Sequence, residues 1–372
     1  MHRHTKKLHD QYGPIVRIAP NECSVCDLQA WKEIYAVNGG FTKTDFYLTQ
    51  APNLSPHADS FTQLDEKKHA FRRRMIQHIF TFKTVLENEK YLDVVTELFI
   101  QRMGELADKG AVFDISEWAY WYTFDAIGEL FFGRMFGLLQ ERKDVGGYIA
   151  AVDIILPHAI RVAVLPKVLW PLQILMLPFS AKFRHSVSVF NSLTAESKKL
   201  VDERVESGKG RPDLLEKLLE VSRDKSPEFD MTDVYTESYT AIFAGSDTTA
   251  VAIRSALYNL CKSSNAYENL QKEIDQYEAE GKLSPIITYA EASKMPYLTA
   301  VCKEAMRVFP SIALTFPRHV PKGGRELCGY YMAAGYRVGV NPAGFHLVKS
   351  IFGEDADEFK PDRWIRPEAK EM

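Results

Sequence analysis

The sequence predicts a mainly α-helical protein with a small β portion. Long segments in the middle of the chain carry apolar residues three and four positions apart, which is the spacing of one helix face. Short alternating or β-branched runs occur toward the two ends. With 372 residues, 46% of them hydrophobic, the chain can bury a large core. No repeat or Gly/Ser linker divides it, so we expect one domain over residues 1–372.

The individual elements follow from local patterns. Residues 15–18 alternate as a strand, and residues 23–26 are expected to return beside it, followed by Asp27 as the N-cap of a helix over 28–37. Late in the chain, residues 327–332 and 336–340 flank a glycine-containing segment, which predicts a hairpin with its loop at 333–335. Further helices are predicted over residues 69–80, 91–106, 118–132 and 190–206.

Charge and cysteine content exclude several classes of protein. Forty-six basic against forty-nine acidic residues leave a net charge of -3, so nucleic acid is not an expected partner. Five scattered cysteines are too few for a disulfide framework. Cys23 and Cys26 form a C-x-x-C without a second pair at zinc spacing, and we interpret them as small half-buried residues of a strand.

Residues 159–179 are the most membrane-like part of the chain. Three prolines, Arg161 and Lys167 interrupt this apolar segment, and a spanning helix needs about 20 consecutive apolar residues, so we do not expect it to span a bilayer. Two interpretations stay open. The segment forms either a pair of core helix fragments or a surface that contacts a membrane interface or caps an apolar channel.

The longest predicted helix covers residues 232–263 and has an unusual centre. Residues 244–249 read Ala-Gly-Ser-Asp-Thr-Thr, and glycine, serine, aspartate and threonine are weak helix formers. In one interpretation, the bare Gly245 lets a flat ligand approach the backbone, and Asp247 and Thr248 form an acid and alcohol pair that relays protons. In the other, these residues form a surface loop between two shorter helices.

A second short string lies on a predicted helix that Pro296 opens and Pro310 closes. Its residues 304–307 read Glu-Ala-Met-Arg, and Glu304 and Arg307 fall off the apolar stripe of this helix. Taken alone, an i,i+3 ion pair of this kind is a solvated surface feature worth about 0.2–0.5 kcal/mol.

Three strings together resemble the cytochrome P-450 superfamily, and in particular its fungal secondary-metabolism members. They are residues 244–249, residues 304–307 and Phe-Lys-Pro-Asp-Arg-Trp at 359–364, in the family's order and approximate spacing. The resemblance covers essentially the whole chain, since residues 12–22, 65–74, 339–342 and 352–356 are also similar. It implies the cytochrome P-450 fold and a haem-dependent monooxygenase.

The resemblance assigns roles to the centre of the long helix. Thr248, preceded by Asp247, matches the acid and alcohol pair that delivers protons during oxygen activation, so these two are the predicted catalytic residues. Ala244 and Gly245 would lie over the face of the haem, and Phe243 would border the substrate cavity.

Cationic residues are implied at the haem carboxylates. His69 and Arg73 lie four apart and match the pair that holds a haem propionate, where a guanidinium forms a charge-assisted hydrogen bond. Arg318 resembles a further propionate contact. Arg72 and Arg74 are expected to point elsewhere, toward a solvated or reductase-facing surface.

The remaining implied residues have structural or substrate-binding roles. Glu304, Arg307 and Arg363 would form a buried network that supports the haem-binding core without reacting. The substrate cavity would be lined by a short apolar segment, which suits an apolar substrate. This segment comprises Ile312, Ala313, Leu314 and Thr315.

In the family, a cysteine thiolate holds the iron, within a Phe-x-x-Gly-x-Arg-x-Cys-x-Gly loop that follows the segment matching residues 359–364. No such loop precedes Met372, so no metal ligand is predicted within this chain, and a truncated fold is expected. None of the cysteines present has the required surroundings: Cys23, Cys26, Cys261, Cys302 and Cys328.

The resemblance also implies partners and a location. Electrons would come from NADPH through cytochrome P-450 reductase, and the substrate would be an apolar small molecule of fungal secondary metabolism. The location implied is the cytoplasmic face of the endoplasmic reticulum, with the cytosol as the alternative because the chain carries no anchor. The alternative to an enzyme is a catalytically dead remnant that binds at most an apolar ligand or a partner protein.

Overall fold

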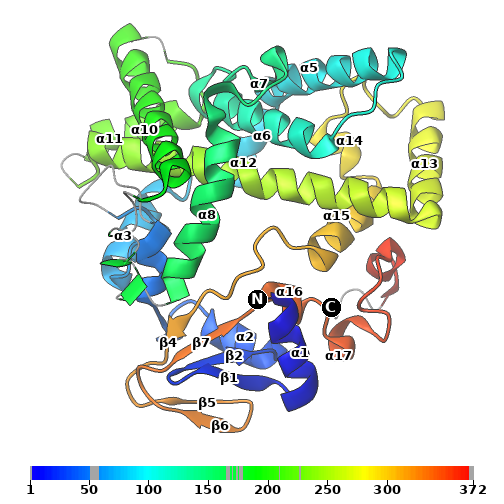
Figure 1. The fold of residues 1–372 in the computed structure, drawn as a ribbon. Coiled ribbons are helices and arrows are strands. Elements are labelled where there is room, and N and C mark those ends of the chain that lie inside the picture. Colours follow the sequence, from blue (N-terminus) through cyan, green and yellow to red (C-terminus); the bar gives the residue numbers. More distant parts are fainter. Residues whose placement is uncertain are drawn as a thin grey trace. The chain divides into compact units, whose positions relative to one another are not determined.

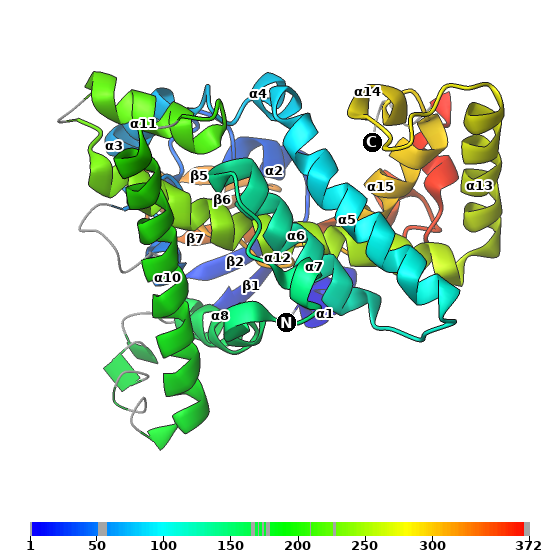
Figure 2. The ribbon, with the colours of Figure 1, turned by 90° about the horizontal axis from the view of Figure 1, so that it is seen from above.

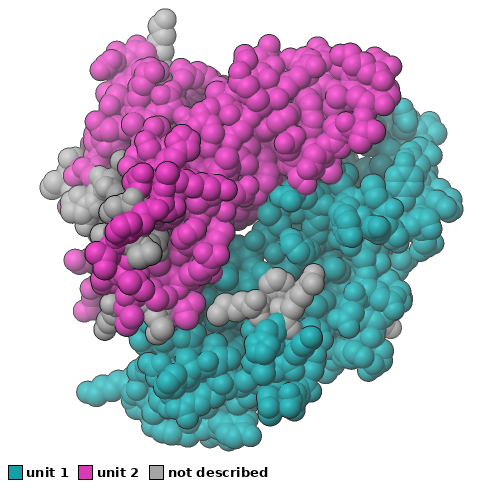
Figure 3. All heavy atoms as spheres, in the orientation of Figure 1, with its two compact units in different colours: residues 1–44, 251–372 teal, residues 45–250 magenta. Residues whose placement is uncertain are grey.

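The computed structural model describes residues 2–50, 58–164, 168–169, 171–172, 175, 179–208, 210–225 and 228–367. The chain divides into two compact units (Figure 3). Unit 1 comprises residues 1–44 and 251–372, and unit 2 comprises residues 45–250. The longest helix, α12 (Met231–Lys262), contributes residues to both units (Figure 1). Each unit is described by itself, and the expectation of one domain over residues 1–372 stays a prediction.

Unit 2 is helical. Helix α5 packs against α6, and α8 packs against α10 and against a 3-10 helix at Asp45–Gln50. Figure 2 shows α5 and α6 as neighbouring helices. Their contacts enclose a core that includes the fully buried Phe131, Leu138 and Leu215. The helices of this unit are α3 (Glu66–Ile76), α4 (Phe82–Glu87), α5 (Glu89–Asp108), α6 (Ile115–Phe132), α7 (Leu138–Glu141), α8 (Tyr148–Val164), α10 (Ala181–Ser207), α11 (Leu214–Lys225) and the first part of α12.

Polar side chains and a glycine define the ends of α6 and the start of α7. Asp114 caps α6 by accepting a hydrogen bond from the Ser116 N–H. The helix ends at Gly133, whose positive φ of 72° suits a residue without a side chain. Buried Asp125 accepts hydrogen bonds from the N–H groups of residues 137–139 at the start of α7, so it joins α6 to the next helix.

Unit 1 contains a five-stranded sheet of order β1-β2-β7-β4-β3. Strands β1 (Ile15–Ala19) and β2 (Glu22–Val25) are antiparallel, and β2 pairs in parallel with β7 (Arg337–Val340). Strand β4 (Arg318–His319) is antiparallel to β7 and to β3 (Thr42–Lys43). Segments from both ends of the chain therefore share one sheet, and the prediction of strands toward the two ends is confirmed.

The helices of unit 1 surround two apolar clusters. One includes the buried Val25, Ile34, Val338 and Val340, and the other includes Leu260 and Val301 of α12 and α15. The helices are α1 (His2–Tyr12), α2 (Leu28–Ile34), the last part of α12, α13 (Ser264–Ala279), α14 (Tyr289–Ala292), α15 (Pro296–Val308), α16 (Pro342–Phe345) and α17 (Lys349–Phe352), with a 3-10 helix at Pro361–Trp364.

The predicted hairpin at residues 327–340 is wrong. Strand β5 (Arg325–Leu327) pairs with β6 (Tyr330–Met332), so the turn lies at Cys328 and Gly329 instead of at residues 333–335. Both turn residues have positive φ, 49° and 79°, which is the geometry of a tight two-residue hairpin turn. The following strand, β7, pairs with β2 and β4 in the five-stranded sheet.

The other predicted elements are confirmed in type, with shifted ends. Helix α12 agrees with the prediction of 232–263 within one residue at each end. Asp27 caps α2 as predicted, since its carboxylate accepts a hydrogen bond from the Ala30 N–H. Pro296 opens α15 as predicted. The prediction from the sequence left out α1, α8, α11 and α13.

The membrane-like segment over residues 159–179 lies partly outside the described residues. Its described apolar side chains are divided, because Val162 and Ala163 at the end of α8 are buried, so both interpretations stay open. The exposed ones are Val164, Val168, Leu172, Leu175 and Phe179. Within the described chain, one helix, Val145–Val164, is long and apolar enough to cross a membrane by length and composition. One such helix is weak evidence, because core helices of soluble proteins meet the same criteria.

Candidate active site

Residues 244–249 lie inside continuous α12, so the loop interpretation is wrong. In two of these weak helix formers, the side-chain hydroxyl donates a hydrogen bond to a backbone carbonyl of α12 itself. Ser246 Oγ donates to the Ile242 carbonyl at 2.9 Å, and Thr248 Oγ1 donates to the Ala244 carbonyl at 2.8 Å. Hydroxyl bonding one turn back is the usual way in which a helix accommodates these residues.

Gly245 permits a close approach between two helices of unit 2. A Cβ added at Gly245 would lie 3.1 Å from Cδ1 of Ile127 on α6, which is tighter than ordinary van der Waals contact. In one interpretation of the sequence, the missing side chain makes room for a flat ligand. In the structure, the direction of the missing side chain is filled by Ile127.

The acid of the predicted catalytic pair is held from the same helix. The Tyr120 hydroxyl on α6 donates a hydrogen bond of 2.5 Å to Oδ1 of Asp247. Both side chains are half-buried. The predicted pair is thus adjacent on α12, with Thr248 bonded back to its own helix and Asp247 bonded to α6.

Phe243, predicted to border the substrate cavity, belongs to an aromatic cluster of unit 2. Its ring stacks on that of Tyr239 at 6.4 Å with an interplanar angle of 4°. Phe190 of α10 meets both rings edge-on, each at 5.6 Å. Three aromatic rings therefore fix the position of Phe243 within unit 2.

Helix α3 carries the predicted propionate pair, His69 and Arg73, one turn apart. Arg73 is exposed, and its side chain forms no ion pair or hydrogen bond with any residue that the structure describes. His69 is half-buried. Arg74 is exposed, consistent with the predicted solvated surface.

The expectation that Arg72 points to a solvated surface is wrong. Its side chain is only 11% exposed and pairs with two carboxylates of α12, at 2.6 Å to Asp233 and 2.9 Å to Glu237. Burial by itself would lower the pKa of Arg72, but these two anions outweigh it and raise the pKa. Helix α3 is thereby joined to the first turns of α12.

Glu237 also receives hydrogen bonds from the loop that precedes α3. The Ser60 N–H and hydroxyl donate to its two carboxylate oxygens at 3.1 and 3.2 Å. Burial raises the pKa of Glu237 against the lowering effect of Arg72. One cation and two buried carboxylates therefore form this network, which we call the Arg72 network: Arg72, Asp233, Glu237 and Ser60.

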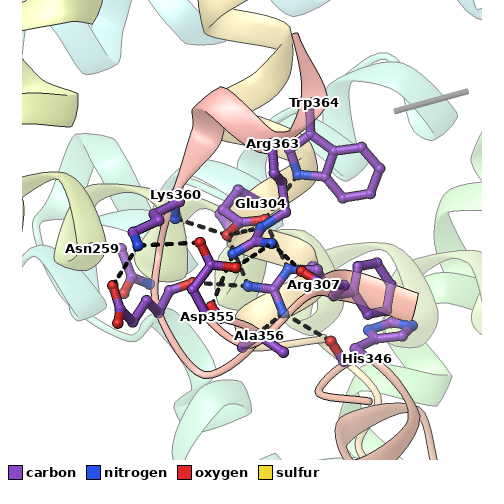
Figure 4. A network of polar contacts seen from close by, with 12 residues as sticks. Asn259, Glu304, Arg307, His346, Asp355, Ala356, Lys360, Arg363 and Trp364 are labelled. Atoms are coloured by element: carbon purple, nitrogen blue, oxygen red, sulfur yellow. Dashed lines mark hydrogen bonds and ion pairs between the residues drawn. The ribbon is translucent and has the colours of Figure 1, made fainter. Parts of the chain in front are cut away.

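Unit 1 holds a network with the opposite charge balance (Figure 4). Glu304 of α15 accepts two hydrogen bonds of 2.8 Å from Arg307 and one of 2.9 Å from Arg363. The Lys360 backbone N–H and the Trp364 indole N–H donate to the same carboxylate at 2.8 and 2.9 Å. We call this group the Glu304 network.

The Glu304 network is buried, so the solvated interpretation of the Glu–Arg pair is wrong. Glu304 is 0% exposed, and the arginine side chains are 2% and 3% exposed. Arg307 also donates to the carbonyls of residues 346, 356 and 358, and Arg363 pairs with Asp355 at 3.1 Å. Burial alone would raise the pKa of Glu304, but the donors lower it below its usual range.

The remaining predicted site residues lie in unit 1. Arg318 is on β4, with its guanidinium 5.9 Å from the centre of the Tyr35 ring. The predicted lining segment, Ile312, Ala313, Leu314 and Thr315, connects α15 to β4, and Ile312 is its exposed member. An added Cβ at Gly339 would lie 2.5 Å from Cγ2 of Thr315, so this glycine allows the segment to pack on β7.

The five cysteines do not suit an iron ligand, which must be a thiolate. Burial raises the pKa of Cys26 to about 12, that of Cys328 to about 11, and that of Cys23. Desolvation also raises the pKa of Cys302 on α15, and Cys261 lies in the last turn of α12. Among the described residues, no group of three or more His, Cys, Asp or Glu side chains could hold a metal ion.

Other features at the predicted positions fit haem, a flat group that is mostly apolar and carries two carboxylates. The small side chain of Ala244 is exposed in the middle of a helix whose neighbours Ile242, Ser246 and Ala250 are buried. Arg73 offers an exposed guanidinium, which pairs well with a carboxylate. These predicted residues fit the group, whereas the cysteines do not fit its iron.

Sequence reasoning missed several residues of these arrangements. Tyr120 contacts Asp247 across 127 positions of sequence, and no local pattern indicates that contact. Asp233 and Glu237 show a four-residue spacing on α12, which places them on one helix face, but nothing marks Arg72 as their partner. Trp364 was part of a recognised string without an assigned role.

A mainly helical fold, an acid and alcohol pair inside one long helix, and a buried Glu–Arg–Arg network define the class of haem-dependent monooxygenases. The chain belongs to the cytochrome P450 family: the family model "Cytochrome P450" matches residues 1–371. The predicted family, fold class and monooxygenase function are confirmed at this level.

Fungal relatives support the same assignment. The chain is 36% identical to cytochrome P450 monooxygenase gsfF of Penicillium aethiopicum over 375 residues, covering 99% of this chain and 74% of that protein. It is 35% identical to cytochrome P450 monooxygenase ACRTS1 of Alternaria alternata, covering 79% of each. A pisatin demethylase of Fusarium vanettenii is 29% identical, covering 98% of this chain and 70% of the relative.

Proposed function

We propose that the chain forms the proton-delivering, propionate-binding and substrate-binding parts of a haem-dependent monooxygenase that oxidises an apolar small molecule of fungal secondary metabolism. Electrons come from NADPH through cytochrome P-450 reductase. The observation that carries the proposal is the Asp247–Thr248 pair within continuous α12, beside the exposed Ala244. When bound, haem supplies the activation of dioxygen.

The residues of the chain handle protons and carboxylates. Asp247 accepts protons and passes them to Thr248, whose hydroxyl both donates and accepts hydrogen bonds. His69, Arg73 and Arg318 bind the two haem carboxylates through charge-assisted hydrogen bonds. The Glu304 network is structural, because its carboxylate is fully buried and already accepts five hydrogen bonds.

The substrate is apolar in this proposal. Phe243, held by Phe190 and Tyr239, is aromatic, and the segment from Ile312 to Thr315, predicted as a lining segment, is mostly apolar. Sites of this composition bind small molecules mainly by removing apolar surface from water. The relatives named as monooxygenases and as a pisatin demethylase are consistent with small organic substrates.

A peripheral membrane contact through residues 159–179 completes the proposal. The exposed Val168, Leu175 and Phe179 provide apolar surface suited to a bilayer interface. Such a contact agrees with a location at the cytoplasmic face of the endoplasmic reticulum. A liposome flotation assay compares the wild type with Leu175→Ser/Phe179→Ser, and equal flotation of the two proteins would contradict this contact.

Haem titration of the purified chain tests the function. We expect stoichiometric binding, weakened about tenfold or more in Arg73→Met because one charge-assisted contact to a carboxylate is lost. Arg74→Met is the matched control, since Arg74 is the exposed neighbour on the same helix and should change nothing. A chain that binds no haem, or an Arg73→Met protein that binds it as tightly as the wild type, would contradict the proposed site.

A reduced CO-difference spectrum tests the iron ligand separately. None of the five cysteines of residues 1–372 suits a thiolate ligand, so we expect these residues alone to bind haem without the thiolate Soret band. The same residues extended by a cysteine-containing ligand loop should show the band and consume NADPH in the presence of reductase. The alternative, a remnant that binds only an apolar ligand, predicts no NADPH consumption by either form.

A further inference from the structure

Asp247 has one side-chain partner in the described part of the chain, and that partner is neutral. The Tyr120 hydroxyl donates to Oδ1 of Asp247 at 2.5 Å, and no ion pair to Asp247 occurs among the described residues. The phenol hydroxyl fixes the direction of the carboxylate through a strong hydrogen bond. Unlike an arginine, it leaves the net negative charge in place, so the carboxylate can still accept a proton.

The packing of α6 on α12 brings Tyr120 to this position. Gly245, two residues before Asp247, allows Ile127 of α6 to approach within van der Waals distance of α12. Tyr120 lies about two turns earlier on α6, so the same helix supplies both contacts. The bare glycine therefore serves to bring α6 close enough for Tyr120 to reach the acid.

The two members of the predicted pair are held in different directions. Asp247 and Thr248 are neighbours, so their side chains differ by about 100° around the helix axis. The Thr248 hydroxyl bonds to its own helix at the Ala244 carbonyl, on the side of the exposed Ala244. Asp247 is directed toward α6. Loss of the Tyr120 hydroxyl would free the carboxylate to rotate.

We propose that Tyr120 is a positioning residue for the acid of the proton relay, holding the Asp247 carboxylate directed toward α6. This inference rests on the proposed function of Asp247 and Thr248. Tyr120 acts through Asp247 and does not itself contact the reacting atoms.

A double-mutant cycle on urea unfolding tests the contact without haem. The variants are Tyr120→Phe, Asp247→Ala and the double variant. A hydrogen bond to a charged group contributes enough free energy to couple the two substitutions. The reduction of the folding equilibrium constant in the double variant should therefore be about tenfold smaller than the product of the two single reductions. Additive effects at neutral pH would overturn the inference.

Tyr122→Phe is the matched control, because Tyr122 lies on the same helix and shares a 3.0 Å hydrogen bond with Thr96. Its effect should be additive with Asp247→Ala at every pH. If Tyr122→Phe couples to Asp247→Ala as strongly as Tyr120→Phe does, the coupling reflects general loosening of α6, and the inference fails.

The C–O stretching frequency of the reduced, CO-bound protein supplies a functional readout. Tyr120→Phe should shift the band in the same direction as Asp247→Ala, the double variant should shift it no further, and Tyr122→Phe should leave it unchanged. A shift in Asp247→Ala without one in Tyr120→Phe would refute the positioning role. Failure to bind haem, or a band insensitive to Asp247→Ala, would instead refute the proposed function, and the haem-free cycle would still decide the inference.

Discussion

The Glu304 network and the Arg72 network are buried ion groups with opposite charge balance. In unit 1, one carboxylate lies between two guanidinium groups. In unit 2, one guanidinium lies between two carboxylates. Removing charges from water costs several kcal/mol for each ion, so each network depends on how completely its surplus charge is hydrogen-bonded.

The two networks meet that demand differently. In the Glu304 network, Arg307 also donates to backbone carbonyls and Arg363 also pairs with Asp355, and the pKa of Glu304 is lowered below its usual range. The surplus anion of the Arg72 network has fewer donors, and burial raises the pKa of Glu237. The Glu304 carboxylate is therefore stable in its ionised form, whereas protonation of Glu237 reduces the surplus negative charge of the Arg72 network.

Glu304→Gln should have the largest effect, because it removes the anion that two buried guanidinium groups share and leaves Arg307 without an ion-pair partner, whereas Arg363 keeps Asp355. Loss of one partner of a buried ion pair costs about 3–5 kcal/mol in free energy of unfolding, which urea denaturation would measure. Glu358→Gln, a change of charge on a neighbouring exposed side chain, serves as the control and should cost little. A loss below about 1 kcal/mol in Glu304→Gln would show that the network is a minor contributor.

Arg72→Met should lower the free energy of unfolding somewhat less, by about 2–3 kcal/mol at pH 8, because protonation of Glu237 can remove the unpaired negative charge. The loss should diminish toward pH 5, where that protonation is easier. Urea denaturation at the two pH values measures both numbers, and Arg74→Met is the exposed control on the same helix. An equal loss at both pH values would argue against the difference between the networks.

The two glutamates should have opposite pH dependence. The pKa of Glu304 is lowered, so its contribution is present above the ordinary pKa of 4.5 and is lost as pH falls through the lowered value. The pKa of Glu237 is raised, so its contribution is present below 4.5 and is lost as pH rises through the raised value.

Glu237→Gln should therefore gain stability relative to the wild type as pH rises from 4.5 into the neutral range. The difference in slope is at most about 1.4 kcal/mol per pH unit for one proton. Glu304→Gln should instead lose stability relative to the wild type as pH rises through its own, lower range. Urea denaturation from pH 3 to 8 follows both variants, and slopes of the same sign would break the comparison.

Trp364→Phe should have the smallest effect, about 1 kcal/mol, because Glu304 retains four other hydrogen bonds. The indole N–H to Glu304 contact of 2.9 Å is lost, while most of the aromatic packing remains. Thermal unfolding measures the change. Ser60→Ala removes a comparable donor from Glu237, and a markedly larger loss there would show that donors are scarcer in the Arg72 network.

The sequence predicted elements well where apolar spacing covers many residues, as in α12. It failed where two local signals compete. The hairpin turn lies at Cys328–Gly329, although Ala333–Gly335 also contains a glycine, because β7 pairs with β2 in the five-stranded sheet. The choice between helix and loop at residues 244–249 depended on packing against α6, which is a tertiary effect.

The site was predictable only to the level of residue type. Arg72, Arg73 and Arg74 are chemically identical, and helix rotation alone decides which one is buried against α12. The family strings identified Glu304, Arg307 and Arg363, and the structure brings these three together. The role of Tyr120 could not be predicted from the sequence, because a long-range contact between two half-buried side chains leaves no periodic pattern in the chain.

The cysteine environments have a practical consequence for labelling. Thiol-reactive reagents attack the thiolate, so the raised pKa values of Cys23, Cys26, Cys302 and Cys328 slow their modification. Cys261 is exposed near the end of α12. Cys302 is exposed as well, on α15, but its pKa is raised. Brief treatment with a maleimide dye at neutral pH should therefore favour Cys261 over Cys302, and so provide an optical reporter on the helix that carries Asp247 and Thr248.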